Sequence, residues 1–312
     1  MFSCNCIACG GACFPAILSV YDSRFGIDSP YNIVRCCDCE LLQTSPRPTE
    51  VDLKALYERH YNFGGESGTT YTNLRQWLYS SWLYRVWLLF DGDISFHLRV
   101  GRGRLLDIGC NEGRGLEFFR QRGYVAEGLE MNANAAAVAK SKGFVVHTER
   151  IEEFNSAEKF DVVVMSNVLE HSLNPVEMLR GARGVVSDDG EVWISCPNSR
   201  SLLRWFFGSY WINWHVPFHL VHFSPVSLND CLTKAGFTVS NIKFESPSLW
   251  VTHSILTRLY FSRGKVNKLL RNHLVVGLAI ISVRLLLFPF LFILNRFGLG
   301  DCLVVTCKPL RS

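Results

Sequence analysis

The stretch LLDIGCNEGRG, residues 105–115, joins an apolar run to a loop that holds three glycines. RLLDI (104–108) has the length and composition of a buried strand. Glycines at 109, 113 and 115 permit a tight turn and a close approach of the backbone to a ligand at the N-terminus of the next helix. A dinucleotide fold needs GxGxxG for its pyrophosphate, and this loop lacks that spacing. The loop therefore predicts a nucleotide-like ligand without a diphosphate.

The pattern of strand, loop and helix repeats downstream of this stretch. Strands are expected at 125–130, 144–147, 160–167 and 191–198, and helices at 115–123, 132–143 and 174–186. Such alternation predicts a parallel, doubly wound sheet whose ligand lies at the carboxyl ends of the strands. Gly109, Glu130 and Asn167 would then share one edge. Glu130 ends the second strand, where its two carboxylate oxygens can accept both hydroxyls of a ribose.

Several motifs along the chain resemble those of the class I S-adenosylmethionine-dependent methyltransferases. DIGCNEG (107–113) resembles the glycine-rich first motif, GLE ending at Glu130 the acidic second motif, and FDVVVMSNVLEH (160–171) the fourth-strand motif. GEVWISCPN (190–198) resembles the fifth-strand segment, and HLVHFSPVSLNDCLTKAGF (219–237) a C-terminal block of several small-molecule methyltransferases. The resemblance implies a Rossmann-like, doubly wound α/β sheet of seven strands with the last strand antiparallel.

This resemblance spans most of residues 45–245 and implies S-adenosylmethionine as the cofactor. Gly109 and its loop would meet the methionine moiety, Glu130 the ribose, residues 149–151 the adenine, and Asn167 the sulfonium. The expected cofactor-binding residues are Asp107, Gly109, Cys110, Asn111, Gly113, Glu130, Met131, Ile151 and Asn167.

Asn111 departs from the family pattern, which usually has glycine at this position. Asparagine is the residue that next best tolerates left-handed backbone, so the turn should survive. The variant itself resembles sugar-modifying methyltransferases.

Histidines are the candidates for a general base. Methyl transfer from a sulfonium depends largely on positioning, so a base is optional, but it helps where the acceptor is a hydroxyl or a carbon acid. The candidates are His171 in VLEH, and His215, His219 and His222 in WHVPFHLVHF. We rank His219 first because it lies in the block expected to cover the substrate, and expect His171 to cap and wall the site. A structural role is the alternative for each of them.

Seven of the twelve cysteines lie within the first 39 residues. Cys6 and Cys9 form one CxxC knuckle, and Cys36 and Cys39 form a second after 26 intervening residues. This spacing predicts a structural zinc site of four thiolates, with buried free thiols as the alternative. Residues 31–49 also resemble a zinc-ribbon entry segment that precedes some sugar-linked methyltransferases.

The ligand register of this site has alternatives within the same region. Glu40 stands where the second knuckle would usually have glycine. The other cysteines that could serve are Cys4, Cys13 and Cys37.

Composition divides the chain into three parts. We expect a zinc-ribbon-like module at 1–48, a helical linker or lid at 49–98, and a methyltransferase domain at 99–312 with an apolar, basic insert at about 248–298. Thr49 can N-cap a helix that starts at Glu50. The aromatic-rich stretch 72–98, with Trp77, Trp82 and Trp87, is expected to be a helical region buried on several sides.

LVVGLAIISVRLLLFPFLFIL (274–294) is long enough to cross a bilayer. Arg284 at its centre and Pro289 in its second half argue against a simple crossing. GDCLVVTCKP (300–309) looks like the last strand of the family and must return to the sheet. We therefore expect either a buried helical insert or a re-entrant or interfacial hairpin bent near Pro289.

The charged residues of this insert are all basic. Between Ser246 and Gly300 there are seven basic residues and no acidic residue. Basic residues that flank an apolar helix suit an anionic membrane surface, so we expect peripheral membrane contact through residues 254–296.

The whole composition bounds the function. The 312 residues are 48% hydrophobic and 19% charged, typical of a folded protein, and a net charge of +4 is too small to indicate nucleic acid. The N-terminal sequence lacks the pattern of a signal peptide, so we expect a cytoplasmic protein, peripheral on the cytoplasmic membrane face. The expected function is O- or C-methylation of a small-molecule or lipid-linked acceptor, such as a polyprenyl-linked sugar or a quinone precursor.

Three alternatives remain open at this point. A nicotinamide-dependent oxidoreductase would share the strand, glycine loop and ribose acid. A binding module without turnover would use the zinc ribbon to recruit a partner. A nucleic-acid methyltransferase is disfavoured, because the N-terminal region has no basic aromatic patch and no NPPY-like base-flipping motif follows the fourth strand.

Overall fold

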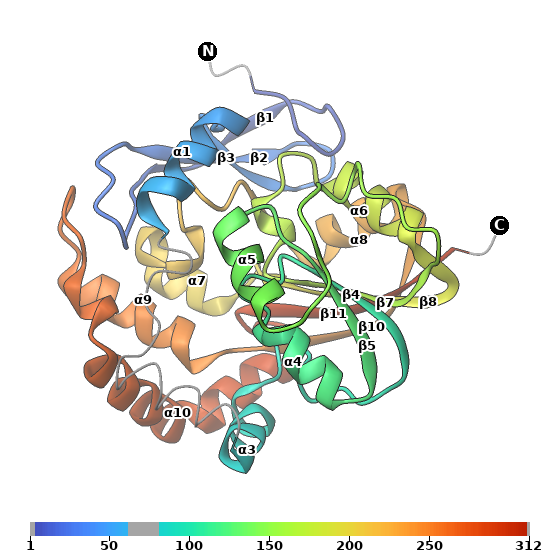
Figure 1. Ribbon diagram of the computed structural model, residues 1–312. Helices are drawn as coiled ribbons and strands as arrows, with labels where there is room; N and C mark the ends of the chain where they lie inside the picture. Colours follow the sequence, from blue (N-terminus) through green and yellow to red (C-terminus); the bar gives the residue numbers. More distant parts are fainter. Residues whose placement is uncertain (1–3, 62–80, 311–312) are drawn as a thin grey trace.

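The computed structural model describes residues 4–61 and 81–310, which contain a seven-stranded and a four-stranded sheet (Figure 1). The strands of the larger sheet lie in the order β10-β11-β8-β7-β4-β5-β6. Neighbours from β8 to β6 are parallel, whereas β11 is antiparallel to both β8 and β10. The predicted Rossmann-like sheet with an antiparallel last strand is confirmed. Its strands are β4 (Gly103–Ile108), β5 (Tyr124–Leu129), β6 (Val146–His147), β7 (Phe160–Ser166), β8 (Val186–Pro197), β10 (Phe237–Glu245) and β11 (Cys302–Pro309).

Helices cover both faces of this sheet because its strands are apolar on both sides. Leu105 and Leu106, adjacent on β4, are both fully buried, and they belong to separate clusters on opposite faces. Leu106 packs in the cluster of α6 and α8, while Leu105 shares a cluster with Phe119 of α4. The covering helices are α4 (Arg114–Gln121), α5 (Ala133–Ser141), α6 (Pro175–Val185) and α8 (Pro225–Lys234).

The smaller sheet joins the N-terminal region to the rest of the chain. Its order is β1-β2-β3-β9, and β3 pairs with β9, a two-residue strand that precedes α8. Thr44 Oγ1 also donates a hydrogen bond of 2.7 Å to the His219 carbonyl. The segment predicted as a separate module is thus continuous, through its sheet, with the larger domain. The strands are β1 (Cys13–Val20), β2 (Tyr31–Cys36), β3 (Leu42–Ser45) and β9 (Val221–His222).

Helix α1 (Glu50–His60) begins where the sequence indicates. The Thr49 side chain accepts from Asp52 N at 3.2 Å, and the Asp52 carboxylate accepts from Thr49 N at 2.9 Å, which makes a capping box. The helix carries Tyr57 toward the larger domain, where its hydroxyl lies 2.9 Å from His171 Nδ1.

The expectation that 72–98 is buried on several sides is wrong for the part that the structure describes. Helix α3 (Trp82–Asp91) is apolar, yet Trp82 is 69% and Leu89 78% exposed. Only Leu88 and Asp91 of this helix are buried, because the helix packs on one side against the C-terminal insert. Trp77 lies outside the described residues.

The insert between β10 and β11 consists of α9 (Ser248–Tyr260), the 3-10 turn η4 (Lys268–Arg271) and α10 (His273–Arg296). α10 is one uninterrupted helix, so the hairpin bent near Pro289 is wrong. Pro289 lies on the exposed side, where the carbonyl of Leu285 that it leaves unbonded can face water. The expectation that 274–294 is a buried helix is also wrong, because few residues of α10 are buried: Val276, Arg284, Leu291 and Leu294.

α10 lies along the body of the molecule beside α9 (Figure 1). Its Leu291 and Leu294 pack with Trp211 and Trp214, which lie between α7 (Leu202–Phe207) and β9. Within residues 4–61 and 81–310, α10 is the one helix long and apolar enough to cross a membrane, by length and composition only.

Candidate cofactor and acceptor site

The loop after β4 is built from left-handed backbone. Gly109, Asn111 and Gly113 have φ values of +71°, +53° and +77°. A Cβ on Gly109 would lie 2.7 Å from Val168 Cγ2, so this position has no room for a side chain. Asn111 adopts the left-handed conformation expected of it, and the tight turn forms without a glycine at that position.

Glu130 ties this loop to the end of β5. Its Oε2 accepts from Asn111 N at 3.0 Å, and its Oε1 accepts from Asn132 N at 2.7 Å. Each carboxylate oxygen keeps a lone pair for a further donor. Burial raises the pKa of Glu130, although the two backbone N–H groups act against that shift.

The remaining predicted cofactor residues lie around the same edge. Asp107 is buried, and burial followed by the nearby Glu130 charge raises its pKa to about 7. Cys110 and Ile151 are buried, whereas Met131 is exposed. These residues can therefore contact a ligand in different ways. The buried ones can line the binding site, and the exposed Met131 can lie over a bound ligand.

Asn167 follows β7 on the same edge of the sheet. It has a φ of +54°, and its backbone N–H donates to Ser195 O at 2.9 Å. Its Oδ1 is buried without a hydrogen-bond partner among the residues that the structure describes. A buried acceptor without a partner is costly, so this oxygen is available to a ligand.

Histidines and tyrosines form a second cluster, next to the 3-10 turn η1 (Leu169–His171). The rings of His171 and His219 lie 4.7 Å apart, and those of His215 and His219 lie 5.0 Å apart. The hydroxyl of Tyr61 is 2.7 Å from His215 Nε2. The structure thus brings together three of the four histidine candidates beneath α1.

His219 is held by a hydrogen bond on its Nδ1 atom. Its Nδ1 is 2.8 Å from Asn213 O, and because a carbonyl only accepts, Nδ1 carries the proton. The lone pair on Nε2 faces Glu170 Oε1 at 4.0 Å. Burial raises the pKa of Glu170 to about 8, so this carboxyl is mainly protonated at neutral pH and faces the ring as a neutral group.

The His171 ring differs from that of His219 in its hydrogen bonds. Its Nδ1 lies 3.0 Å from Phe218 O, to which it can donate, and this leaves the lone pair on Nε2. Burial lowers the pKa of His171 to about 4, so the ring is neutral at physiological pH. Within the described residues, the Nε2 lone pair of His171 therefore accepts no hydrogen bond.

His222 is in a structural position. Its Nε2 lies 3.2 Å from Thr44 Oγ1, the hydroxyl that donates to His219 O. It therefore joins β3 to β9.

The sequence did not point to Tyr57, Tyr61 and Phe25 as parts of this cluster. Phe25 lies 5.4 Å from Phe218 and 5.9 Å from His215 between ring centroids. The i, i+4 spacing of Tyr57 and Tyr61 on α1 was a readable signal, since such residues share one helix face. Nothing local marked Phe25, which comes from the loop between β1 and β2.

The chain matches a known family over this region. Residues 89–242 fit the family model described as a methyltransferase domain. These residues form a methyltransferase domain.

Curated relatives of this methyltransferase domain have similar names. The chain is 28% identical over 107 residues to the ubiquinone biosynthesis O-methyltransferase of Haemophilus ducreyi, covering 30% of this chain and 45% of the relative. It is 29% identical over 171 residues to the ubiquinone biosynthesis O-methyltransferase of Pseudomonas aeruginosa (strain LESB58), covering 50% of this chain and 71% of that one. The match thus spans less than half the length of the first of these relatives.

A solved structure is similar over most of the chain. It is the Burkholderia thailandensis 1,6-didemethyltoxoflavin-N1-methyltransferase with bound 1,6-didemethyltoxoflavin and S-adenosylhomocysteine, at 14% identity and a TM-score of 0.45. The similarity covers 91% of this chain and 98% of that chain.

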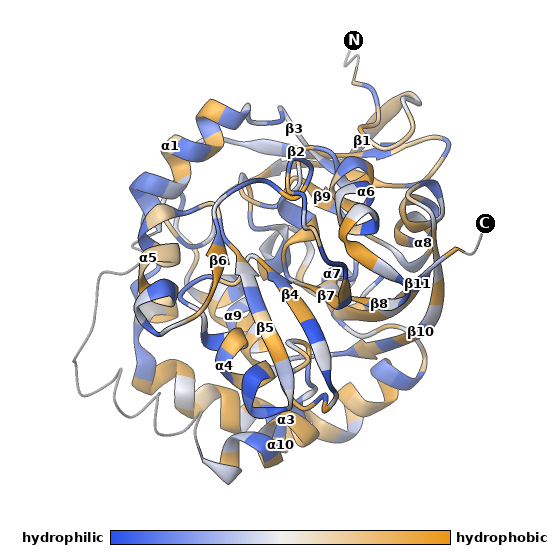
Figure 2. Cartoon of the chain, turned by 45° about the vertical axis from the view of Figure 1, so that its right-hand side comes forward, coloured by the Kyte–Doolittle hydropathy of each residue, from blue (hydrophilic) through white to orange (hydrophobic). Residues whose placement is uncertain are grey.

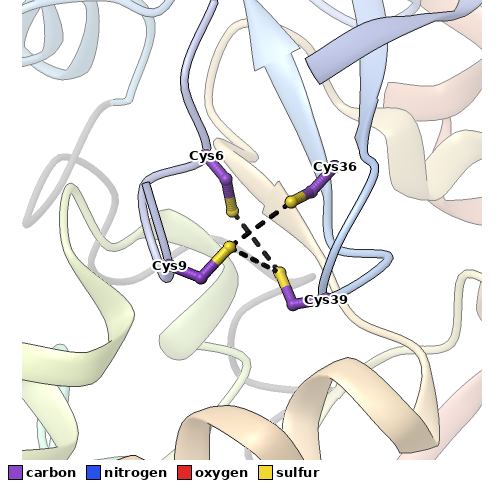
Figure 3. A group of neighbouring side chains, drawn as sticks. All are labelled: Cys6, Cys9, Cys36 and Cys39. Carbon is purple, nitrogen blue, oxygen red and sulfur yellow. Dashed lines mark hydrogen bonds between the residues drawn. The ribbon is translucent and has the colours of Figure 1, made fainter. Parts of the chain in front are cut away.

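Four cysteines cluster outside the methyltransferase domain (Figure 3). The Sγ atoms of Cys6 and Cys39 are 3.5 Å apart, those of Cys9 and Cys36 3.4 Å, and those of Cys9 and Cys39 3.5 Å. Four thiolates that each lie about 2.3 Å from one zinc ion would be about 3.8 Å apart, so only a small expansion is needed. Glu40 has a φ of +60°, the conformation for which a glycine is usual in such knuckles. The cysteines that offered other registers, Cys4, Cys13 and Cys37, are not part of this group.

Proposed function

We propose that the protein is an S-adenosylmethionine-dependent methyltransferase that acts on a hydroxyl of an aromatic, quinone-precursor type of acceptor. The observation that carries the proposal is Glu130, which sits at the carboxyl edge of the sheet with one oxygen bonded to the glycine loop. A ribose can donate to the free lone pairs of this carboxylate, and the methionine moiety fits against the loop where Gly109 and Gly113 carry no side chain. When bound, S-adenosylmethionine supplies a methyl group already activated on a sulfonium.

The choice of acceptor rests on two supports. Relatives named ubiquinone biosynthesis O-methyltransferases favour an aromatic hydroxyl. The cluster of Tyr57, Tyr61 and Phe218, with ring centroids 5.1 to 5.3 Å apart, offers faces on which an aromatic ring can pack. A lipid-linked sugar and a carbon acceptor are the finer alternatives.

His171 is the proposed proton acceptor. Its neutral ring and the lone pair on Nε2 can take the proton of an acceptor hydroxyl while the oxygen attacks the methyl group. His219, the first choice from the sequence, directs its lone pair toward Glu170 and supports the wall instead.

Labelled methyl transfer tests this function. The protein is incubated with methyl-labelled S-adenosylmethionine and catechol, with 4-methylcatechol as a substituted analogue. We expect label on a phenolic oxygen of at least one diol and none on phenol ethers that lack a free hydroxyl. Label on a ring carbon would change the acceptor atom, and turnover with NAD but not with S-adenosylmethionine would contradict the proposal.

A structural zinc ion bound by Cys6, Cys9, Cys36 and Cys39 is part of the proposal. The spacing of the four sulfurs and the left-handed turns at Gly10 and Glu40 support it. Because all four positions would be filled by protein, the metal would serve the fold and not the reaction. Metal analysis should find about one zinc per chain, and its absence from protein purified without chelator would reject the site.

We also propose peripheral attachment of a cytoplasmic protein to an anionic membrane. α3 and α10, which lie near the bottom of Figure 2, together expose many apolar side chains. These exposed residues are Trp82, Leu83, Val86, Leu89, Leu274, Leu278, Ile281, Leu285, Leu286, Phe290, Phe292 and Ile293.

Arg284 is not among these exposed residues, because it points into the protein. It is 4% exposed, its Nε lies 3.5 Å from Asp91 Oδ1, and its guanidinium lies 5.0 Å from the Phe90 ring. An outer face of α10 without charged side chains from Leu274 to Ile293, and the packing of α10 along α9, favour a position in the plane of the interface over a crossing. Sedimentation with anionic vesicles at low salt tests this, with phosphatidylcholine vesicles as control; no enrichment on the anionic vesicles would reject attachment.

A further inference from the structure

Arg24, in the loop between β1 and β2, has a buried guanidinium. The side chain as a whole is half-buried, but its guanidinium is enclosed by protein, and its Nε has no solvent access and no hydrogen-bond partner. Within the described residues no acid lies within 4.0 Å of it, and its guanidinium makes no hydrogen bond. Burying a charge in this way is expensive unless something supplies the missing counter-charge.

The nearest acid is already committed to the backbone. Asp22 accepts from Arg24 N at 3.1 Å, from Phe25 N at 2.7 Å and from Ile27 N at 3.1 Å. These bonds fix the loop between β1 and β2 and hold Arg24 in place. They leave the guanidinium with its donors unused.

Arg24 lies close to the histidine cluster that is proposed to contact the methyl acceptor. The neighbouring Phe25 ring packs against His215 and Phe218. Burial and, after it, the charge of Arg24 lower the pKa of His215 and of His253 on α9, and the same charge acts on His171. Arg24 thus lies among the loop, the His215 segment and α9, close to the proposed base.

Other unpartnered polar atoms line the same region. His215 Nδ1, Asn213 Nδ2 and His253 Nε2 are buried without hydrogen-bond partners in the described part of the chain. Asn213 Nδ2 is a donor, and each imidazole can donate from one nitrogen, so the group suits a ligand that accepts hydrogen bonds.

We propose that Arg24 binds an oxyanion, a carboxylate or a phosphate, carried by the methyl acceptor. Guanidinium donors match two oxygens of either group, and neutral histidines and an amide can complete the shell. The assignment to the acceptor rests on the proposed methyltransferase function, whereas the binding of an oxyanion does not. It selects charged acceptors over uncharged ones of the same shape.

Calorimetric titration with matched probes tests this site. The probes are 3,4-dihydroxybenzoate, catechol, which is the same diol without the carboxylate, and inorganic pyrophosphate, each with and without S-adenosylhomocysteine. The wild type should bind at least one of the two oxyanions. Arg24→Met should weaken that binding roughly 10-fold to 100-fold, as expected for the loss of a charged hydrogen-bond donor, and leave catechol within about twofold. The response of each oxyanion separates a carboxylate from a phosphate.

The control is Arg59→Met, which removes an exposed arginine of α1. Failure of the wild type to bind either oxyanion, or equal binding by Arg24→Met, would overturn the proposal. Loss of S-adenosylhomocysteine affinity alone in Arg24→Met would place the guanidinium at the cofactor and would also overturn it. Wild-type binding of an oxyanion without binding of S-adenosylhomocysteine would reject the methyltransferase function and leave the oxyanion site standing.

The thermal unfolding temperature of Arg24→Met distinguishes a loss of binding from a loss of folding. An unpaired buried charge destabilises the empty protein, so Arg24→Met without ligand should unfold at the same temperature as the wild type or higher. A large fall in its unfolding temperature would show a structural arginine and contradict the proposal.

Discussion

Glu170 and His171 are neighbours whose pKa values are shifted in opposite directions by the same cause. Burial disfavours the charged form of each, so it raises the pKa of the acid to about 8 and lowers that of the imidazole to about 4. Both side chains are therefore mainly uncharged near neutral pH. A neutral imidazole with a free nitrogen is the form that a general base requires.

The pH dependence of turnover should reflect this shift. Because the lowered pKa keeps His171 unprotonated well below the usual value of about 6.5, kcat should stay level from pH 7.5 down to about pH 5.5. His171→Gln should lower kcat by about 10²-fold or more with little change in cofactor affinity. His147→Gln, on β6, is the matched control. A loss of kcat in His219→Ala with none in His171→Gln would reverse the assignment.

At the scale of elements, a buried ion pair helps to hold the insert to α3. Asp91 at the end of α3 pairs with Arg284 in the middle of α10 and accepts from Ser248 N, at the start of α9, at 3.0 Å. The Phe90 and Phe288 rings stack beside it at 4.6 Å. One carboxylate therefore connects three helices.

Asp91→Ala should be strongly destabilising. It strands the Arg284 charge and an N–H group of α9 at the same time, so we expect a loss of about 3–5 kcal/mol in the free energy of unfolding. Urea denaturation measures it. Asp230→Ala, which breaks the exposed pair with Lys234, should cost less than about 1 kcal/mol. Equal effects of the two substitutions would show that the buried pair does not anchor the insert.

At the scale of the whole molecule, the sheet that follows the cysteine cluster supports the histidine cluster. β3 follows the second knuckle and pairs with β9, and Thr44 binds the main chain at His219. The glycine loop and Glu130 belong to the larger sheet, at the ends of β4 and β5. Damage to the N-terminal sheet should therefore reach the histidines before it reaches the cofactor residues.

Metal removal should affect acceptor binding more than cofactor binding. After treatment with a strong chelator, the unfolding temperature and the affinity for the acceptor should fall, while the affinity for S-adenosylhomocysteine should change by less than about threefold. Cys37→Ser, which changes an exposed cysteine outside the cluster, is the control for thiol loss. An unchanged unfolding temperature after the metal is removed would contradict a structural role.

Local patterns predicted the elements of this fold, and tertiary pairing decided the rest. Apolar stretches alternating with glycine turns were sufficient to predict β4, β5, β7 and β8, because the apolar residues of each strand lie close together in the sequence. The pairing of β3 with β9 places Leu42 opposite His222 and Gln43 opposite Val221, residues far apart in the sequence, and has no local signature. The continuation of α10 as one helix through Pro289, and the position of Arg24, also depend on residues that are distant in the sequence.

The most direct test of the account is calorimetric titration with S-adenosylhomocysteine, compared between the wild type and Glu130→Ala. The account predicts saturable binding of one molecule per chain, weakened about tenfold or more in the variant, which loses the charged acceptor for the ribose hydroxyls. Titration with NAD under the same conditions should give no binding. Absence of S-adenosylhomocysteine binding to the wild type, or equal binding by Glu130→Ala, would contradict the assignment of this site.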